Sequence, residues 1–186
     1  MKGDGAILVA CAVLVAAALS AAGAGAQSSA AIAPLSALSG SWFEIASYGS
    51  SWQRRCVRDR TLAVVTRSKN DADLHIRCRT MSGVEVRAGR LQADGVDGRW
   101  RARFAPAALG WLPAVWGDFW VVGHDRDLNW FVLGERDHQR LAVFSRTVAL
   151  DESALAQAMG LARRAGFDPG RLVRVPHDPD EWRTIR

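Results

Sequence analysis

Residues 57–104 read VRDRTLAVVTRSKNDADLHIRCRTMSGVEVRAGRLQADGVDGRWRARF, and this stretch alternates short runs of β-prone residues with turn residues. Valine, isoleucine, threonine and aromatic residues favour strands, whereas Gly, Asn, Asp and Ser favour tight turns. The turns are Lys69-Asn70-Asp71, Ser82-Gly83 and the segment 94–98. Their spacing predicts antiparallel strands joined by hairpins, which is typical of a β-sandwich or a β-barrel.

The same rhythm continues on both sides of this stretch, with further turn residues at 125–127 and 136–138. One helix is predicted at 151–166, because Asp151 is suited to cap it and Gly166 to end it. Its apolar stripe is expected to cover strands that are apolar on both faces. The predicted strands are 41–48, 57–67, 73–80, 84–94, 99–104, 118–124, 129–134 and 140–145, with 172–175 as a candidate ninth.

Cys56 and Cys78 are predicted to form a disulfide. A hairpin at 69–71 places the start of one strand beside the end of the next, where the two cysteines would meet. An even pair of cysteines in an exported chain is most simply a disulfide. No metal site is predicted, because the four histidines stand far apart in the sequence.

The first 26 residues have the pattern of a secretory signal peptide: a polar start, an Ala/Val/Leu run and the ending Ala24-Gly25-Ala26. We therefore predict a signal peptide at 1–26, an N-terminal extension at 27–37, one domain at 38–176 and a C-terminal tail at 177–186. The mature protein would be periplasmic or secreted. The alternative is an outer-membrane lipoprotein anchored at Cys11, because the segment 8–11 is similar to a lipobox.

The chain has 24 Lys+Arg against 19 Asp+Glu and a net charge of +5. The arginines are dispersed, so a nucleic-acid partner is not expected. A weak attraction to anionic lipid headgroups is compatible with the charge. The apolar segment 105–113 is predicted to form a lip of the fold or a loop that touches a membrane, which makes peripheral membrane contact a candidate property.

Four short segments resemble motifs of one family. The run Gly40-Ser41-Trp42-Phe43-Glu44-Ile45-Ala46 resembles the Gly-x-Trp opening of lipocalins, and in particular of the bacterial outer-membrane branch. The segment 116–122, the acidic turn around Asp125 and Ser145-Arg146-Thr147 resemble that branch's later motifs, in the same order. Two departures occur: Leu128 stands where tyrosine is usual, and Val148 where this branch often has proline.

The resemblance implies an all-β calycin fold, an eight-stranded antiparallel up-and-down β-barrel with a C-terminal α-helix packed outside. It also implies a structural role for Gly40, Trp42, Asp125 and Arg146, with Trp42 inward at the closed end and Arg146 across its ring. Strand alternation from Trp42 then sends Glu44, Ala46 and Tyr48 inward. Arg146 or water is the expected partner of Glu44, because a buried carboxylate needs one.

The barrel interior is the predicted ligand site. By the resemblance Trp120 faces the cavity, and alternation adds Val122 and His124 on the same face. The aromatic-rich region supplies further candidates, although Trp116 and Trp130 could instead pack under the helix. The full set of candidate ligand-binding residues is Tyr48, Trp111, Trp116, Trp120, Val122 and His124.

The predicted function is binding, and possibly transport or storage, of a small hydrophobic ligand. A fatty acid or lysophospholipid is favoured, because the branch that the chain resembles is associated with them, and an arginine at the mouth would meet the headgroup. No catalytic residues and no cofactor are predicted, because the common catalytic motifs are absent from the sequence. Two alternatives stay open: a binder of a pigment or quinone, and a lipocalin-fold enzyme that uses Glu44 or His124. The oligomeric state is not predicted.

Overall fold

The computed structural model describes residues 34–49, 53–95 and 98–178. The predicted signal peptide, Cys11, most of the predicted N-terminal extension and residues 179–186 of the tail lie outside the described residues.

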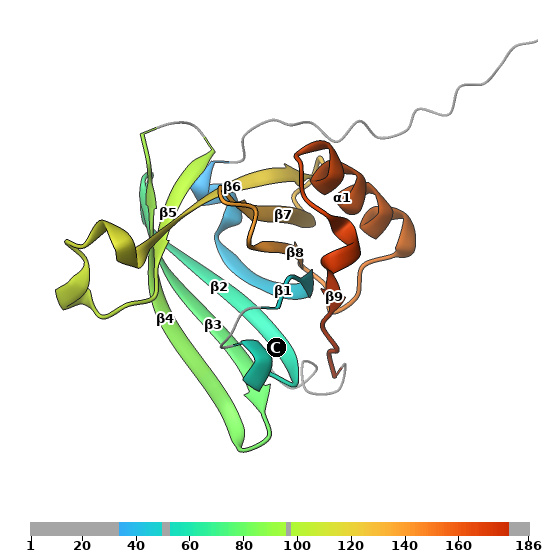
Figure 1. Cartoon of the computed structure of the whole chain (residues 1–186), viewed down its shortest axis with the longest axis horizontal. Helices are drawn as coiled ribbons and strands as arrows, with labels where there is room; N and C mark the ends of the chain where they lie inside the picture. Colours follow the sequence, from blue (N-terminus) through green and yellow to red (C-terminus); the bar gives the residue numbers. More distant parts are fainter. Residues whose placement is uncertain (1–33, 50–52, 96–97, 179–186) are drawn as a thin grey trace, which may run out of the picture.

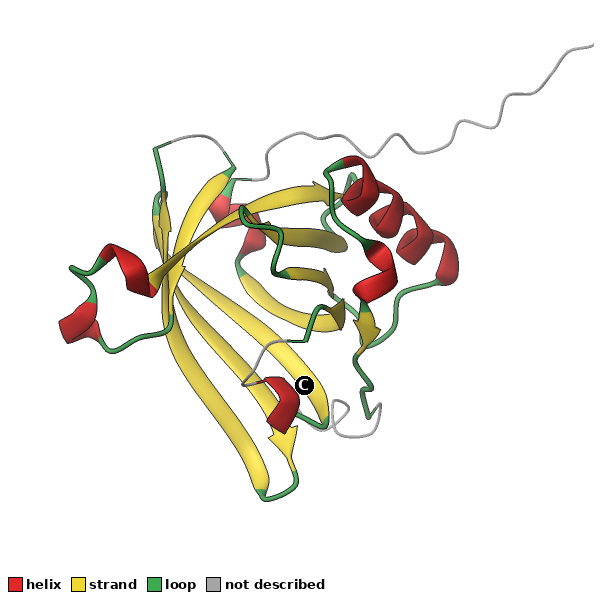
Figure 2. Ribbon diagram, viewed as in Figure 1, coloured by secondary structure: helices red, strands yellow, loops and turns green. Residues whose placement is uncertain are grey.

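Eight strands form one closed antiparallel barrel (Figures 1 and 2). The strands are β1 (Gly40–Ser47), β2 (Arg58–Ser68), β3 (Asp71–Thr80), β4 (Gly83–Ala93), β5 (Arg99–Arg103), β6 (Trp116–His124), β7 (Trp130–Glu135), β8 (Leu141–Ser145) and β9 (Val173–Arg174). Neighbours in the chain pair with each other from β1 to β8, and β8 pairs with β1 to close the barrel. The ninth strand, β9, pairs antiparallel with the end of β1, at Ala46 and Ser47. The predicted fold class is confirmed.

The sequence of β5 explains why a barrel forms. Its residues alternate strictly between arginine and an apolar residue, and Trp100 and Ala102 are buried while the arginines between them are more exposed. Successive side chains of a strand point to opposite faces, so one face of this strand turns to the interior and the other to water. Closure into a barrel buries the apolar face without leaving an open sheet edge.

The helix α1 (Glu152–Arg164) lies outside the barrel (Figure 1). Its amino end is capped by Asp151, whose carboxylate accepts a hydrogen bond from the Ala154 amide at 2.8 Å. Its buried face contacts β6 and β7. Gly123 on β6 allows this close approach, because a Cβ at that position would lie 2.6 Å from the Leu161 side chain.

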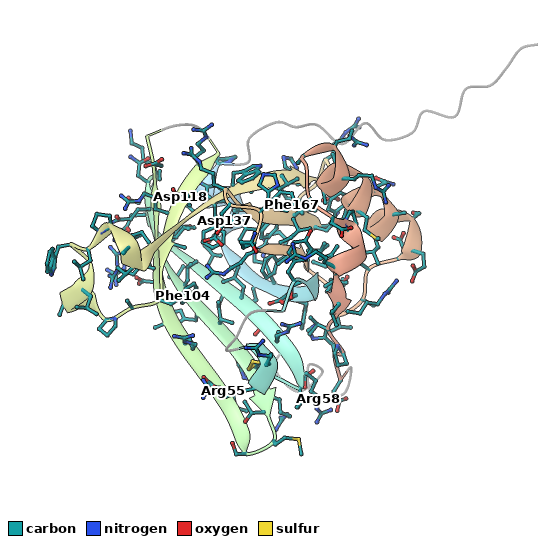
Figure 3. The ribbon with its side chains drawn as sticks, viewed as in Figure 1. Arg55, Arg58, Phe104, Asp118, Asp137 and Phe167 are labelled. Atoms are coloured by element: carbon teal, nitrogen blue, oxygen red, sulfur yellow. A yellow bond between two sulfur atoms is a disulfide. The ribbon has the colours of Figure 1, made fainter. Side chains whose placement is uncertain are left out.

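The molecule therefore has two cores. One fills the barrel and includes Trp42, Trp100 and Phe131. The other lies between the barrel and α1 and includes Trp130, Val132 and Phe167, the last of which is labelled on the helix side in Figure 3. The strand β7 serves both cores, which is why its sequence is apolar on both faces.

A short 3-10 helix, η1 (Leu35–Leu38), fills one end of the barrel together with Trp42. The Trp42 indole nitrogen donates to the Leu38 carbonyl at 2.7 Å, and the Arg146 guanidinium carbon lies 3.4 Å from the centre of the Trp42 ring. Arg146 also donates to the carbonyl oxygens of Ser41 and Ser39. The predicted N-terminal extension thus contributes Leu35 to the closed end.

The disulfide between Cys56 and Cys78 is confirmed, with the two Cα atoms 5.6 Å apart. It joins the segment before β2 to the end of β3, as the antiparallel register predicts. A bridge of this kind is consistent with an exported protein. Within the described residues, no helix is long and apolar enough to cross a membrane.

Candidate ligand-binding site

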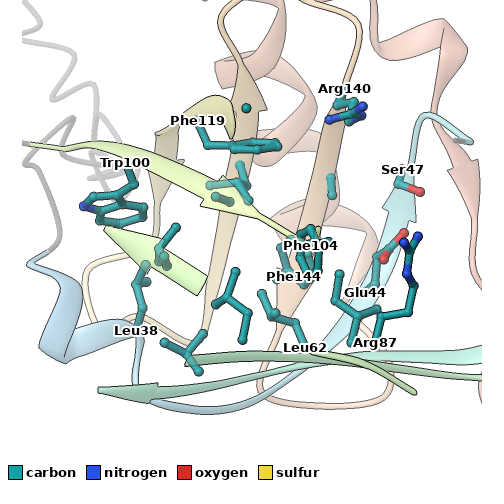
Figure 4. Close-up of a pocket in the computed structure, with 18 of the residues that line it drawn as sticks. Leu38, Glu44, Ser47, Leu62, Arg87, Trp100, Phe104, Phe119, Arg140 and Phe144 are labelled. Carbon is teal, nitrogen blue, oxygen red and sulfur yellow. The ribbon is translucent and has the colours of Figure 1, made fainter. Parts of the chain in front are cut away.

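The barrel encloses a cavity of about 570 Å³ (Figure 4). This volume falls within the range of about 300–1,000 Å³ that is usual for sites that bind small molecules. Residues of all eight barrel strands line it. The cavity is therefore a product of the closed sheet and does not depend on any one loop.

One end of the cavity is apolar. Leu38 of η1 and Trp100 of β5 lie at this end in Figure 4. Leu62, Leu91 and Phe144 line the wall nearby and are buried. An apolar chain placed here would lose its contact with water, which stabilises binding by about 0.8 kcal/mol for each buried CH₂ group.

The other end carries polar side chains. Glu44, Ser47, Arg87 and Arg140 are grouped on one side of the cavity in Figure 4, opposite Trp100. The Glu44 carboxylate is buried, and its Oε1 lies 3.2 Å from the Arg60 guanidinium. Arg140 pairs with Glu135, with 3.1 Å between its Nη1 and the Glu135 Oε1.

Glu135 stands behind this polar end. Burial raises the pKa of its carboxyl group, and the positive charge of Arg140 opposes that shift. Gly117, which lines the cavity, leaves space for this carboxylate, because a Cβ on Gly117 would lie 2.6 Å from the Glu135 Oε1. The cavity is thus amphipathic, with an apolar interior and a charged end.

A family model described as a lipocalin-like domain matches residues 34–177, which is most of the chain. The chain belongs to the lipocalin family.

Temperature-induced lipocalin-1 of Arabidopsis thaliana is similar to this lipocalin, with 29% identity over 153 residues that cover 78% of this chain and 81% of the plant protein. Lobster apocrustacyanin A1 has a similar structure, with a TM-score of 0.62 at 11% identity, covering 81% of this chain and 85% of that chain. Insecticyanin from the tobacco hornworm Manduca sexta has a TM-score of 0.61 at 14% identity, covering 80% and 83%. The two structural likenesses show a shared fold.

Three of the motif residues of this lipocalin lie at the closed end of the barrel, and the fourth lies in the turn between β6 and β7. Trp42 is fully buried at the closed end with Arg146 across its ring. Gly40 has a φ of +100°, in the region that glycine favours. Asp125 holds the turn between β6 and β7, because its Oδ1 accepts hydrogen bonds from the amides of Asn129 and Trp130.

The side chains of β6 that face the cavity are not the ones we predict. Trp120 and Val122 belong to the core under α1, where the Trp120 ring lies 5.5 Å from that of Phe167. Phe119 faces the cavity instead, because it is paired with Trp100 across β5 and β6, and directly paired residues share a face of a sheet. Both faces of β6 are apolar, so the sequence of this strand alone does not distinguish the two phases.

A bulge in β1 shifts the alternation there. The pairing of β1 with β8 slips between Glu44 and Ala46, so that Ser47 lies opposite Ala142, and both of these residues line the cavity. Tyr48 borders the cavity, but its ring packs towards Phe167 and its hydroxyl donates to the Asp168 carbonyl at 2.7 Å. The expected partner of Glu44 also differs, because Arg60 fills this role and Arg146 stays at the closed end.

The remaining predicted site residues lie away from the cavity lining. His124 is buried and its Nδ1 is 2.6 Å from the Asp125 carbonyl oxygen. Trp116 donates from its indole nitrogen to the Gly110 carbonyl, with the guanidinium groups of Arg101 and Arg103 each 5.2 Å from its ring. Trp111 is 77% exposed on the loop between β5 and β6, and Trp130 packs under the helix.

Sequence reasoning missed Trp100, Phe119, Ser47, Arg87 and Arg140 as lining residues. The alternation of β5 carried the signal for Trp100, since its neighbours on both sides are arginines. Arg87 and Arg140 had no such signal, because the sequence does not distinguish a cavity-facing arginine from the many arginines that face solvent. No group of His, Cys, Asp and Glu residues suited to hold a metal ion occurs within the described ranges.

Proposed function

We propose that this lipocalin is an exported protein that binds, and transports or stores, a small hydrophobic ligand with an acyl chain. A fatty acid or a lysophospholipid is the favoured ligand. The observation that carries the proposal is the 570 Å³ cavity, which is apolar at its closed end and charged at the other. The lipocalin fold suggests binding of a small hydrophobic ligand, and the charged end favours one that also has a polar head.

The test is a variant that fills the cavity. Ala102 is buried on β5 and lines the cavity, so Ala102→Phe would occupy part of the space that an acyl chain needs. Ala88 on the neighbouring strand β4 is exposed, so Ala88→Phe is the matched control. We expect Ala102→Phe to weaken binding of dodecanoate at least tenfold and Ala88→Phe to leave it unchanged.

Binding can be followed through Trp100, which lines the cavity and should be quenched by a brominated fatty acid. A Trp100→Phe variant identifies the part of the signal that comes from this residue. Melting curves show whether Ala102→Phe is still folded. If a folded Ala102→Phe protein binds dodecanoate as well as the parent does, the ligand does not occupy the barrel and the proposal is wrong.

A pigment or quinone is the alternative cargo, and a flat ring system would also fit an apolar cavity. Native mass spectrometry of the protein from its producing cell, followed by solvent extraction, separates the alternatives. An acyl lipid in the extract supports the proposal, whereas a coloured or redox-active compound supports the alternative.

We propose binding rather than catalysis. The Glu44 carboxylate is held by Arg60, and His124 packs outside the cavity lining against the Asp125 carbonyl. Of the lining residues that the structure describes, Glu44 is the only Asp, Glu or His. Turnover of a bound lipid that Glu44→Gln abolishes while binding persists would favour the enzyme.

We also propose that the protein belongs to the bacterial outer-membrane branch and acts in the periplasm or outside the cell. The Gly-x-Trp opening and the Ser145-Arg146-Thr147 segment support the branch, and the disulfide supports export. The mass of the mature protein tests this proposal. A chain that begins at Gln27 and is two hydrogens lighter than its reduced form is expected, whereas a lipidated chain that begins at Cys11 would indicate an anchored lipoprotein.

We further propose that the protein contacts an anionic membrane surface. The loop between β5 and β6 exposes Leu109 and Trp111, and Arg101 and Arg103 lie at its base against Trp116. An exposed tryptophan beside cationic side chains suits the boundary between lipid tails and headgroups. Because the same loop contributes Ala105 and Pro106 to the cavity wall, contact here would bring a lipid source close to the cavity.

Vesicle binding tests this contact. We expect Trp111→Ser to weaken binding to vesicles of phosphatidylcholine and phosphatidylglycerol several-fold. Val65→Ser, which removes an exposed apolar side chain from β2, is the control and should have no effect. Equal binding of all three proteins would contradict the contact.

A further inference from the structure

The Ser47 side chain is buried at the polar end of the cavity. Ser47 is 1% exposed and lines the cavity, and its Oγ has no hydrogen-bond partner in the part of the chain that the structure describes. Buried polar side chains nearly always have a partner. The cavity is where Ser47 can meet one, so we expect a polar group of the cavity's occupant to serve.

The charges around Ser47 indicate which kind of polar group this is. Arg87 and Arg140 line the same end of the cavity, together with the carboxylate of Glu44. Arg60 neutralises Glu44, and Glu135 pairs with Arg140. Among the lining residues, Arg87 and Arg140 are positively charged and Glu44 is negatively charged, so the lining has an excess of positive charge.

The direction of the cavity fixes how a ligand would lie. The polar end with Ser47 and Arg140 is opposite the apolar end with Leu38 and Trp100 (Figure 4). A chain would extend towards Trp100, because its burial there is favourable. The polar head would then lie beside Ser47, where it is the only part of the ligand able to accept hydrogen bonds.

We propose that Ser47, Arg87 and Arg140 form a subsite for the anionic head of a single-chain amphiphile, a carboxylate or a phosphate. This inference rests on the proposed function, since it requires an acyl ligand in the barrel. The Ser47 hydroxyl donates one hydrogen bond to the anionic head, and the two arginines supply positive charge and further donors. Arginine is well suited to this role because its planar guanidinium matches both carboxylate and phosphate.

Three probes with the same chain test the subsite: dodecanoate, dodecyl phosphate and dodecanol, each measured by calorimetric titration. Ser47→Ala removes only the hydroxyl. We expect this variant to bind the two anionic probes about tenfold more weakly or worse, as for loss of a hydrogen bond to a charged group. The affinity for dodecanol, which has no charge, should fall far less. The melting temperature of the empty protein should not fall, because the hydroxyl that is removed had no partner in the fold.

A second variant keeps the test independent of Ser47. Arg140→Gln removes a side chain that is 58% exposed and paired with Glu135, and Arg174→Gln removes one that is also 58% exposed but paired with Glu152 outside the barrel. We expect only Arg140→Gln to lower the affinity for dodecanoate and dodecyl phosphate, by about threefold to tenfold. The difference should become smaller as salt is added, because the group is partly exposed.

Inorganic phosphate distinguishes a lipid head from a free anion. It should give no measurable binding at the concentrations that saturate dodecyl phosphate, because it has no chain to bury. If it binds and Ser47→Ala abolishes that binding, the subsite serves a free anion and the proposed amphiphile is wrong.

The remaining outcomes separate the two proposals. If dodecanol binds as tightly as dodecanoate and neither variant changes their ratio, the head-group subsite is wrong while the barrel remains a lipid binder. If none of the three probes binds, the proposed function fails and the subsite fails with it.

Discussion

Gly40 has no side chain, and this absence allows the packing of Arg146 at the closed end of the barrel. Its φ of +100° is unfavourable for other residues, and a Cβ there would lie 3.0 Å from the Arg146 Nη1. The glycine of the Gly-x-Trp motif therefore lets the guanidinium reach both the Trp42 ring and the Ser41 carbonyl. Glycine, tryptophan and arginine act as one unit here.

Gly40→Ala is expected to lower the free energy of unfolding by about 1–3 kcal/mol, the usual cost of a side chain in a strained backbone conformation. Urea unfolding measures this value. Gly160 is the control, because it lies within α1 and a Cβ there would come no closer than 3.6 Å to Arg164. Gly160→Ala should instead stabilise the protein by about 0.5–1 kcal/mol. Two changes of the same sign would contradict this account.

Glu135 gives a prediction that depends on pH. Burial raises its pKa above the ordinary value of 4.5, so the folded protein keeps this proton at pH values where the unfolded chain has lost it. The parent protein therefore loses stability as the pH rises from about 4.5 through the raised pKa. Glu135→Gln has no proton to lose, so its stability relative to the parent should increase over that same window.

The measurement is urea unfolding of both proteins at several pH values. Arg140→Gln adds a second test, because it removes the positive charge that opposes the shift and should move the window to higher pH. A difference between parent and Glu135→Gln that does not vary with pH would show that the raised pKa is wrong.

At the scale of the element, the cap of α1 is the feature most open to test. Hydrogen bonds from the Ala154 amide and the Ser153 hydroxyl lower the pKa of Asp151. Its stabilising effect is therefore complete above the ordinary pKa of about 3.8 and is lost as the pH falls through the lowered value. Asp151→Ala should lower the melting temperature at pH 7, and by a smaller amount in strong acid.

Asp151→Asn is the control, because asparagine caps helices about as well as aspartate does and does not titrate. Its melting temperature at pH 7 should lie closer to that of the parent than to that of Asp151→Ala. An equal loss for Asp151→Ala at pH 7 and in strong acid would contradict a role for the ionised carboxylate.

The elements also show what the sequence could predict. The hairpins, the helix with its cap and the ninth strand follow local chemistry, and the structure has all of them. The inward faces of β1 and β6 could not be predicted in the same way. A bulge after Glu44 shifts the alternation of side chains along β1, so the residues that face the cavity change after it. Because β6 is apolar on both faces, only its pairing with Trp100 on β5 determines which of its side chains face the cavity. The barrel interior stays the predicted site, whereas the cavity-facing side of β6 differs from the prediction, because Phe119 and not Trp120 lines the cavity.

At the scale of the whole molecule, the disulfide links two segments that the barrel alone would hold by hydrogen bonds. It closes a loop of 22 residues, which corresponds to roughly 3 kcal/mol in the chain-entropy account. Reduction should lower the free energy of unfolding by about that amount, as measured by urea unfolding with and without dithiothreitol. The double variant Cys56→Ala/Cys78→Ala should behave like the reduced protein and be insensitive to reductant. Identical midpoints for the oxidised and reduced protein would contradict this expectation.

The plugged end of the barrel has a consequence for kinetics. Because Leu35, Leu38 and Trp42 fill that end, a ligand that enters tail first must leave through the same opening by which it entered. A competing ligand cannot displace the bound one through the closed end, so the bound ligand must dissociate before the competitor enters. Release of a preloaded lipid should then proceed at one rate, however much competitor is added.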